Sequence, residues 1–252
     1  MTSQSRVVLI TGVTSGIGKA TAELLIKEGH RVVGDGRQQD KLTALTQSLG
    51  QNFVGICGDA SDTEHLETLF SQALNQFNAP VDAVIVNAGR GLSGSVKEAD
   101  LSQFDAILKL NVSGAAQLMQ QSARRMVAQQ AAQFPHKATD IVVIGSVVGR
   151  HISPFGATYS ATKFAVHCLT ESLRREVGPK GVRVTLIEPG VVVSGFQEAA
   201  GYKDDVTDVF NEKFGPLLYP IDVANTILFS LNQPPHVHVS NIMVRPTRQD
   251  YP

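Results

Sequence analysis

Short apolar runs alternate along the chain with longer stretches in which apolar residues recur at helical spacing. The first run, Val7–Ile10, is too short for a helix and apolar at every position, which is typical of a strand buried on both faces of a sheet. The predicted strands are 7–10, 31–34, 53–57, 83–86, 141–144, 182–187 and 237–244, and the predicted helices are 19–28, 41–49, 64–77, 157–177 and 221–231. Segment 126–139 reads as a helix extension and a surface loop. The alternation predicts βαβ units, and therefore an α/β fold with a parallel sheet and right-handed crossovers.

Composition narrows the class of protein. The 252 residues fit one domain (1–252), with no internal repeat or linker to divide it. With 42% hydrophobic residues, 18% charged residues and a net charge of −1, we expect a soluble cytoplasmic protein that binds neither nucleic acid nor membrane. No apolar stretch approaches the length of a membrane span. Cys57 and Cys168 make no disulfide framework, and we expect two buried thiols.

A glycine-rich segment follows the first strand directly. It reads Thr11-Gly-Val-Thr-Ser-Gly-Ile-Gly18 and leads into an amphipathic helix. Glycines at such a turn let the backbone approach a pyrophosphate, and the helix N-terminus offers free N–H groups and the positive end of the dipole. The spacing is G-x-x-x-G-x-G, and its place after a strand favours a dinucleotide site.

The ends of the next three strands carry further candidates for the same ligand. Asp35 could hold the ribose hydroxyls and Arg37 a 2′-phosphate, unless both belong to a solvated turn. Asp59 could accept a hydrogen bond from an adenine amino group, or merely cap a turn. The small segment Asn87-Ala88-Gly89 would let a cofactor lie against the backbone at the end of the fourth strand.

Tyr159 and Lys163 stand at positions i and i+4 of a predicted helix and should project from one face. An ammonium beside the phenol lowers the pKa of a tyrosine, which otherwise titrates near 10. Ser146, at the end of the fifth strand, could hold a carbonyl oxygen for the tyrosine to protonate. By itself, Y-x-x-x-K also arises by chance as an ordinary helix pair.

Other segments are less specific. Loop 147–156 should rim the site, where Arg150 and His151 either meet an acidic substrate or are solvated. Segment 194–216 is polar and is the best candidate for a substrate-binding lid. His236 and His238 share one face of a predicted strand, but no acidic or cysteine cluster accompanies them, so no metal site is predicted.

Together these motifs resemble the short-chain dehydrogenase/reductase family, in its single-domain branch of similar length, over nearly the whole chain. The matching pieces are TGVTSGIG at 11–18, NAG at 87–89, Asn111, Ser146, YSATK at 159–163 and PG at 189–190. The resemblance implies a Rossmann-type, doubly wound, seven-stranded parallel sheet in the order 3-2-1-4-5-6-7, with helices on both faces. It also implies a catalytic tetrad of Asn111, Ser146, Tyr159 and Lys163.

In that tetrad Tyr159 would pass a proton to the carbonyl oxygen that Ser146 holds. Lys163 would lower the pKa of the tyrosine and grip the nicotinamide ribose, and Asn111 would hold a water that replenishes the proton. The implied cofactor contacts are Gly12, Thr14, Ser15, Gly16, Ile17, Gly18, Arg37, Asp59, Ala60, Asn87, Ala88, Gly89, Tyr159, Lys163, Pro189, Gly190, Val192 and Ser194.

By position the resemblance favours NADP(H). NAD-preferring relatives carry an acid where this chain has Gly36, and NADP-preferring ones commonly carry an arginine at the position of Arg37. Two departures are Ser15, where many such relatives have a second basic residue, and the acidic Asp35 nearby. An NAD-dependent enzyme with Asp35 on the ribose is the alternative.

The segments VVGDGRQQDKL and IEPG and the ending HVHVSNIMVRPTRQ are similar to NADP-dependent dehydrogenases of serine and other 3-hydroxy acids, a subgroup with broad carbonyl reductases. The substrate would then be a small carbonyl compound or alcohol. The RPTRQ tail resembles one that packs between subunits, which predicts a homotetramer, with a dimer as the alternative. A catalytically silent dinucleotide-binding sensor is a further alternative, although such relatives often lose the tetrad.

Overall fold

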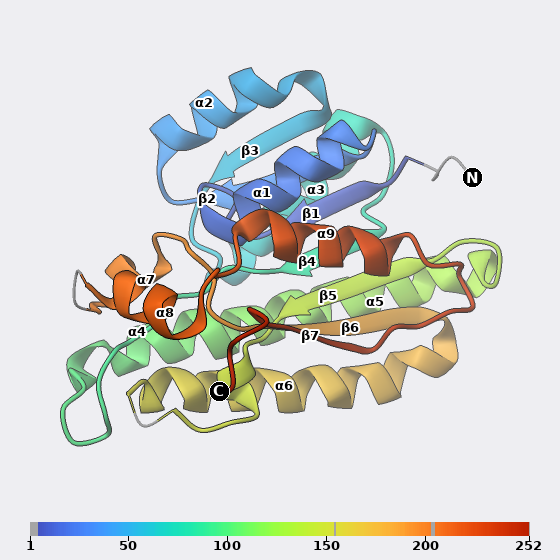
Figure 1. Ribbon diagram of the computed structural model, residues 1–252. Coiled ribbons are helices and arrows are strands. Elements are labelled where there is room, and N and C mark those ends of the chain that lie inside the picture. The colour runs from blue at the N-terminus through green and yellow to red at the C-terminus, as the bar shows by residue number, and fades with distance from the viewer. Residues whose placement is uncertain (1–4, 154, 203–204, 252) are drawn as a thin grey trace.

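The computed structural model describes residues 5–153, 155–202 and 205–251. Within them, seven parallel strands form one sheet in the order β3-β2-β1-β4-β5-β6-β7 (Figure 1). Their bounds are Val7–Ile10 (β1), Arg31–Gly36 (β2), Phe53–Cys57 (β3), Ala83–Val86 (β4), Thr139–Ile144 (β5), Val182–Pro189 (β6) and Asn241–Val244 (β7). The predicted doubly wound sheet is confirmed, with its reversal of strand order at β1.

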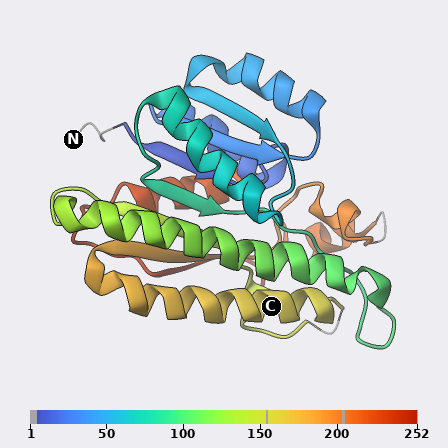
Figure 2. The same ribbon diagram turned by 180° about the vertical axis from the view of Figure 1, so that it is seen from behind.

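Helices cover both faces of the sheet, because alternate residues of each central strand point to opposite sides. In β1, Val8 and Ile10 pack beneath α1, α2 and α9, whereas Val7 and Leu9 pack beneath α3, α5 and α6. Figures 1 and 2 show these two layers from opposite sides. The helices are α1 (Gly16–Lys27), α2 (Gln39–Leu49), α3 (Thr63–Phe77), α4 (Phe104–Leu108), α5 (Ala115–Gln133), α6 (Ala157–Val177), α7 (Phe196–Ala199), α8 (Val206–Phe214) and α9 (Pro220–Leu231).

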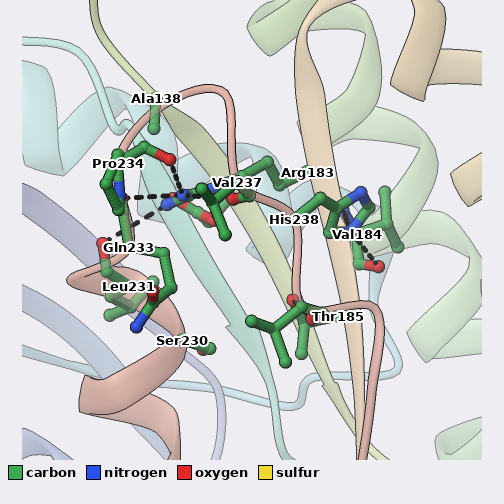
Figure 3. A network of polar contacts seen from close by, with 12 residues as sticks. Ala138, Arg183, Val184, Thr185, Ser230, Leu231, Gln233, Pro234, Val237 and His238 are labelled. Carbon is green, nitrogen blue, oxygen red and sulfur yellow. Dashed lines mark hydrogen bonds and ion pairs between the residues drawn. The ribbon is translucent and has the colours of Figure 1, made fainter.

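The last strand is shorter than predicted, since the chain from 237 to 240 is not part of the sheet. The Arg183 guanidinium donates to the carbonyl oxygens of Gln233 (2.8 Å), Pro234 (3.1 Å) and Val237 (3.0 Å). The ring of His238 contacts the backbone of Val184, as Figure 3 shows. These contacts tether the segment before β7 to the start of β6. Because this segment is not a strand, His236 and His238 do not share a strand face as predicted.

Both cysteines are exposed, so the prediction of buried thiols is wrong. Cys57 is the last residue of an edge strand, and Cys168 lies on the outward side of α6. Free cysteine is among the most often buried residue types, so residue type and apolar neighbours favoured burial at both positions. In the segment predicted as helix extension and loop, α5 continues to Gln133 and β5 begins at Thr139.

No helix within residues 5–153, 155–202 and 205–251 is long and apolar enough to cross a membrane. Pro154 of the predicted loop 147–156 and residues 203–204 of the predicted lid lie outside the described residues, as do 1–4 and 252 at the termini.

Candidate active site

The predicted site residues come together at the carboxyl ends of the parallel strands. The glycine turn follows β1, Arg37 follows β2, and Asp59 and Ala60 follow β3. Asn87, Ala88 and Gly89 follow β4, Ser146 follows β5, and Gly190, Val192 and Ser194 follow β6, whose last residue is Pro189. This edge, at the reversal of strand order, is where open α/β sheets bind ligands.

The glycine turn is built for close backbone approach. Gly12 has φ +76°, and a Cβ on Gly18 would lie 2.2 Å from the Gly12 carbonyl oxygen, so only glycine fits there. Ser15 precedes α1, and its side chain makes no capping hydrogen bond. The first turn of α1 thus begins at the strand edge, where free helix N–H groups suit a pyrophosphate. Thr14 and Ile17 belong to the same turn.

Asn87 joins two neighbouring strand ends. Its Nδ2 donates to the carbonyl oxygen of Thr11 at 2.8 Å, and the hydroxyl of Thr11 accepts the N–H groups of Asn87 and Ala88 at 3.1 Å each. Asn87 thus holds the glycine turn against β4. The sequence motif did not indicate this structural use of its side chain.

Asp35 turns inward instead of facing the edge. The residue is 1% exposed, and its carboxylate accepts the N–H of Gly12 at 2.6 Å and contacts Nε2 of His65 at 3.1 Å. A Cβ on Gly36 would lie 2.4 Å from a methyl carbon of Thr14, so any side chain at position 36 would require Thr14 to move. The exposed Arg37 is the charged group that β2 presents at this edge.

Asp59 caps its own turn, which was one of the two alternatives from the sequence. Its carboxylate accepts the N–H of Ser61 at 2.9 Å. That backbone hydrogen bond holds the pKa of Asp59 below its ordinary value.

Tyr159 and Lys163 project from the start of α6 toward the end of β5, next to Ser146. The Lys163 Nζ lies 5.7 Å from the centroid of the Tyr159 ring and donates to the carbonyl oxygen of Ile144 at 2.7 Å. Lys163 is 7% exposed, and burial lowers its pKa to about 8. The ammonium is therefore anchored to the strand end rather than directly to the phenol.

The pKa of Tyr159 is raised, whereas its spacing from Lys163 predicted a lowered value. Burial of the phenol is the main cause, and a hydrogen bond with Ser146 acts in the opposite direction. The sequence indicated the neighbouring charge but not the degree of desolvation. At neutral pH the phenol keeps its proton.

Asn111 lies in a π-helical turn, Lys109–Gly114, between α4 and α5. Such turns are rare and often occur at functional sites. Asn111 is 3% exposed; its Oδ1 accepts the N–H of Arg90 at 2.9 Å, and its Nδ2 donates to the Arg90 carbonyl at 2.8 Å and to the Thr162 hydroxyl at 3.1 Å. Asn111 therefore links the loop after β4 to the helix that carries Tyr159.

The predicted lid segment packs over the phenol. The ring of Phe196, at the start of α7, lies 5.3 Å from that of Tyr159. The carbonyl of Ala200 accepts the N–H of Ser93 at 2.9 Å, and the Ser93 hydroxyl donates to the carbonyl of Gly201 at 2.8 Å. The segment is therefore seated on the loop after β4.

The side chain of Arg150 is committed to an ion pair with Glu188, which is 1% exposed. The solvated-loop alternative and the acidic-substrate alternative both missed this pair, because the two residues lie 38 positions apart.

Gln249, in the tail, accepts the N–H of Val191 at 3.0 Å within the same chain. His167, behind Ser146, was also missed, and only its place one turn after Lys163 could have indicated it.

Comparisons with known proteins agree with the observed fold. Residues 6–205 match a family model described as short chain dehydrogenase. An uncharacterized oxidoreductase of Staphylococcus aureus is 33% identical over 242 residues, which are 96% of this chain and 97% of that protein. A structure of the closed form of serine dehydrogenase with NADP+ is 26% identical with a TM-score of 0.86, over 97% of this chain and 96% of that one. A 3-ketoacyl-(acyl-carrier-protein) reductase from Brucella melitensis with NADH, 24% identical over 97% and 98% of the two chains, has the same fold with a TM-score of 0.86.

Proposed function

Since the chain belongs to the short-chain dehydrogenase family, we propose that it interconverts a carbonyl compound and a secondary alcohol, with NADP(H) as its cofactor. The observation that carries the proposal is the cluster at the end of β5. There, Ser146, Tyr159 and Lys163 lie together at the strand edge that also holds the glycine turn. The nicotinamide, when bound, supplies or accepts the hydride.

The side chains account for the proton. Tyr159 is protonated at neutral pH, which is the state required to donate a proton to a carbonyl oxygen. The Ser146 hydroxyl donates a hydrogen bond to the same oxygen, and the ammonium of Lys163 stabilises the phenolate that remains. Asn111 holds the site together from the π-helical turn, and its further role in relaying a proton through water remains part of the proposal.

The choice of NADP(H) rests on the groups at the end of β2. Arg37 is exposed there and can pair with a 2′-phosphate. The carboxylate of Asp35 is occupied by Gly12 and His65, and position 36 carries no acid but a glycine that lies against Thr14. These contacts argue against the NAD alternative, in which Asp35 would take the ribose hydroxyls.

The glycine turn (Gly12 to Gly18) would hold the pyrophosphate and Arg37 the adenosine phosphate. Asp59 and Ala60 would face the adenine, and Asn87, Ala88 and Gly89 the adenosine side of the cofactor. Tyr159, Lys163, Pro189, Gly190, Val192 and Ser194 would surround the nicotinamide and its ribose.

For the substrate we propose a small 3-hydroxy acid, with serine as one member, or a simple carbonyl compound. Similarity to serine dehydrogenase supports the first class. Segment 194–216 would close over the substrate, with Phe196 against the catalytic tyrosine. Arg150 is not the group that would bind a substrate carboxylate, because Glu188 holds it.

We further propose a cytoplasmic homotetramer, with a dimer as the alternative, from the resemblance of the RPTRQ tail. Light scattering coupled to gel filtration measures the mass directly. A monomer at working concentration would refute the assembly without affecting the proposed chemistry.

The decisive experiment measures NADPH oxidation and NADP+ reduction with a panel of small ketones, aldehydes, serine and other 3-hydroxy acids. We expect turnover that Tyr159→Phe abolishes. Tyr219→Phe, which changes an exposed tyrosine at the start of α9, is the matched control and should keep full turnover. Turnover that survives in Tyr159→Phe would refute the mechanism. NADPH binding without turnover on any substrate would instead favour the silent sensor.

A further inference from the structure

Helix α6 holds the end of β5 at two points one helical turn apart. The Nζ of Lys163 donates to the carbonyl oxygen of Ile144 at 2.7 Å. One turn further along, Nε2 of His167 accepts the backbone N–H of Ser146 at 3.2 Å. The helix that carries Tyr159 therefore binds the backbone on both sides of the turn at which Ser146 leaves the strand.

The loop around Ser146 is shaped to the imidazole of His167. A Cβ on Gly145 would lie 2.3 Å from Nε2, and a Cβ on Gly149 would lie 2.3 Å from Cε1 of the same ring. Real side chains never approach so closely, so both glycines are needed if the loop is to curl around the ring. The sequence Gly145-Ser-Val-Val-Gly149 is thus complementary to one histidine.

The other side of the ring faces a buried carboxylate. Because Nε2 accepts the Ser146 N–H, a neutral imidazole must carry its proton on Nδ1. That nitrogen lies 3.9 Å from Oε2 of Glu188, a distance at which the carboxylate favours the Nδ1–H tautomer. Glu188 is in turn held by Arg150 and by Nδ2 of Asn241 at 3.2 Å.

The protonation state agrees with this arrangement. Burial lowers the pKa of His167 to about 4, against the opposing effect of Glu188. The ring is therefore neutral at physiological pH and available as an acceptor.

We propose that His167, oriented by Glu188, is a positioning residue for Ser146. It holds the Ser146 backbone, and with it the hydroxyl, in register with Tyr159, because Tyr159 and His167 both belong to α6. The inference rests on the proposed function of Ser146 and Tyr159, and it assigns the register of the serine to a residue outside the tetrad.

Two variants separate positioning from packing. His167→Leu fills the space between the glycines but offers no acceptor, whereas His167→Gln places an amide oxygen at a reach similar to that of Nε2. His30→Leu is the matched control, since Nδ1 of His30 accepts the Arg6 N–H at the same 3.2 Å, at the opposite end of the sheet.

Four quantities are measured for each variant: kcat and KM with the best substrate, the Kd for NADPH by fluorescence, and the hydrogen-exchange rate of the Ser146 amide without ligands. For His167→Leu we expect kcat to fall at least about tenfold, the factor that about 1.4 kcal/mol of lost transition-state stabilisation produces. Its Kd for NADPH should not change, and its Ser146 amide should exchange faster. We expect His167→Gln to recover most of both losses, and His30→Leu to keep the wild-type kcat.

Wild-type kcat in His167→Leu would overturn the proposal, as would equal losses in the leucine and glutamine variants. If the wild-type protein binds NADPH but turns nothing over, the proposed function fails, and the amide exchange then decides alone. Faster exchange in the leucine variant with protection retained in the glutamine variant would still support the positioning contact. Equal exchange in all variants would overturn it.

Discussion

Variants of the inward-facing Asp35 test whether this acid has a structural role or binds the cofactor. Its carboxylate joins the glycine turn, through the Gly12 N–H, to His65 on α3. Asp35→Ala removes this connection, while Asp35→Asn keeps an acceptor of the same shape without the charge. If the acid instead took the ribose hydroxyls, both variants would weaken NADH binding selectively.

The size of the effect follows from the two contacts. Hydrogen bonds to a charged group contribute about 1.5–3 kcal/mol each, and a buried donor left without a partner adds a desolvation cost. With Asp35 only 1% exposed, we expect Asp35→Ala to lower the free energy of unfolding by about 3–5 kcal/mol and Asp35→Asn by about 1–2 kcal/mol.

The same pair also predicts a pH dependence. The hydrogen bond to Asp35 raises the pKa of His65 above its ordinary value, so the folded protein binds the proton more tightly than the unfolded chain. The resulting stabilisation is complete below about pH 6.5 and is lost as the pH rises through the raised value. Asp35→Asn should reduce this loss.

Urea unfolding followed by circular dichroism between pH 5.5 and 8.5 measures both effects, and titration with NADPH and NADH measures the affinities. We expect the ratio of the two affinities to stay close to that of the wild-type protein in both variants. Unchanged stability together with a selective loss of NADH binding would refute the structural role of Asp35 and restore the NAD alternative.

Three further predictions concern buried charges and the lid. Arg183→Met removes the partner of Asp140 in a pair whose side chains are 5% and 2% exposed. Arg6 still pairs with Asp140, so we expect the free energy of unfolding to fall by about 1.5–3 kcal/mol, the contribution of a hydrogen bond to a charged group. A loss of less than about 1 kcal/mol in urea unfolding would contradict the stabilising role of this pair. Burial lowers the pKa of Lys163 to about 8, so the free energy of unfolding of the wild-type protein should rise with pH between that value and about 10.4. Lys163→Met should abolish both this rise and the turnover. An identical pH dependence of stability in the two proteins would refute the burial argument. Phe196→Ala should expose the phenol of Tyr159 and thereby lower its pKa. The pH–rate profile should then shift to lower pH, and an unshifted profile would contradict the contact between the two rings.

Local patterns in the sequence were sufficient for most of the helices and strands and for the motifs that the fold brings to one edge of the sheet. A run such as Val7–Ile10, apolar at every position, is buried on both faces because its neighbours in the sheet are parallel strands covered by helices. The i and i+4 relation of Tyr159 and Lys163 is a property of one helix, so it survives any packing. The strand order was implied by family resemblance rather than by periodicity, and the structure confirms it.

Contacts between distant segments were decided only by the tertiary structure. Asp35 and His65 lie 30 positions apart, and Ser146 and His167 lie 21 apart, so no local pattern indicates that the first pair hides an acid or that the second holds a serine. The same holds for the raised pKa of Tyr159, because desolvation depends on what covers the phenol, here Phe196. Sequence periodicity determines which face of an element is buried, whereas the partner of each polar group on that face is set by the packing of elements that are remote in the chain.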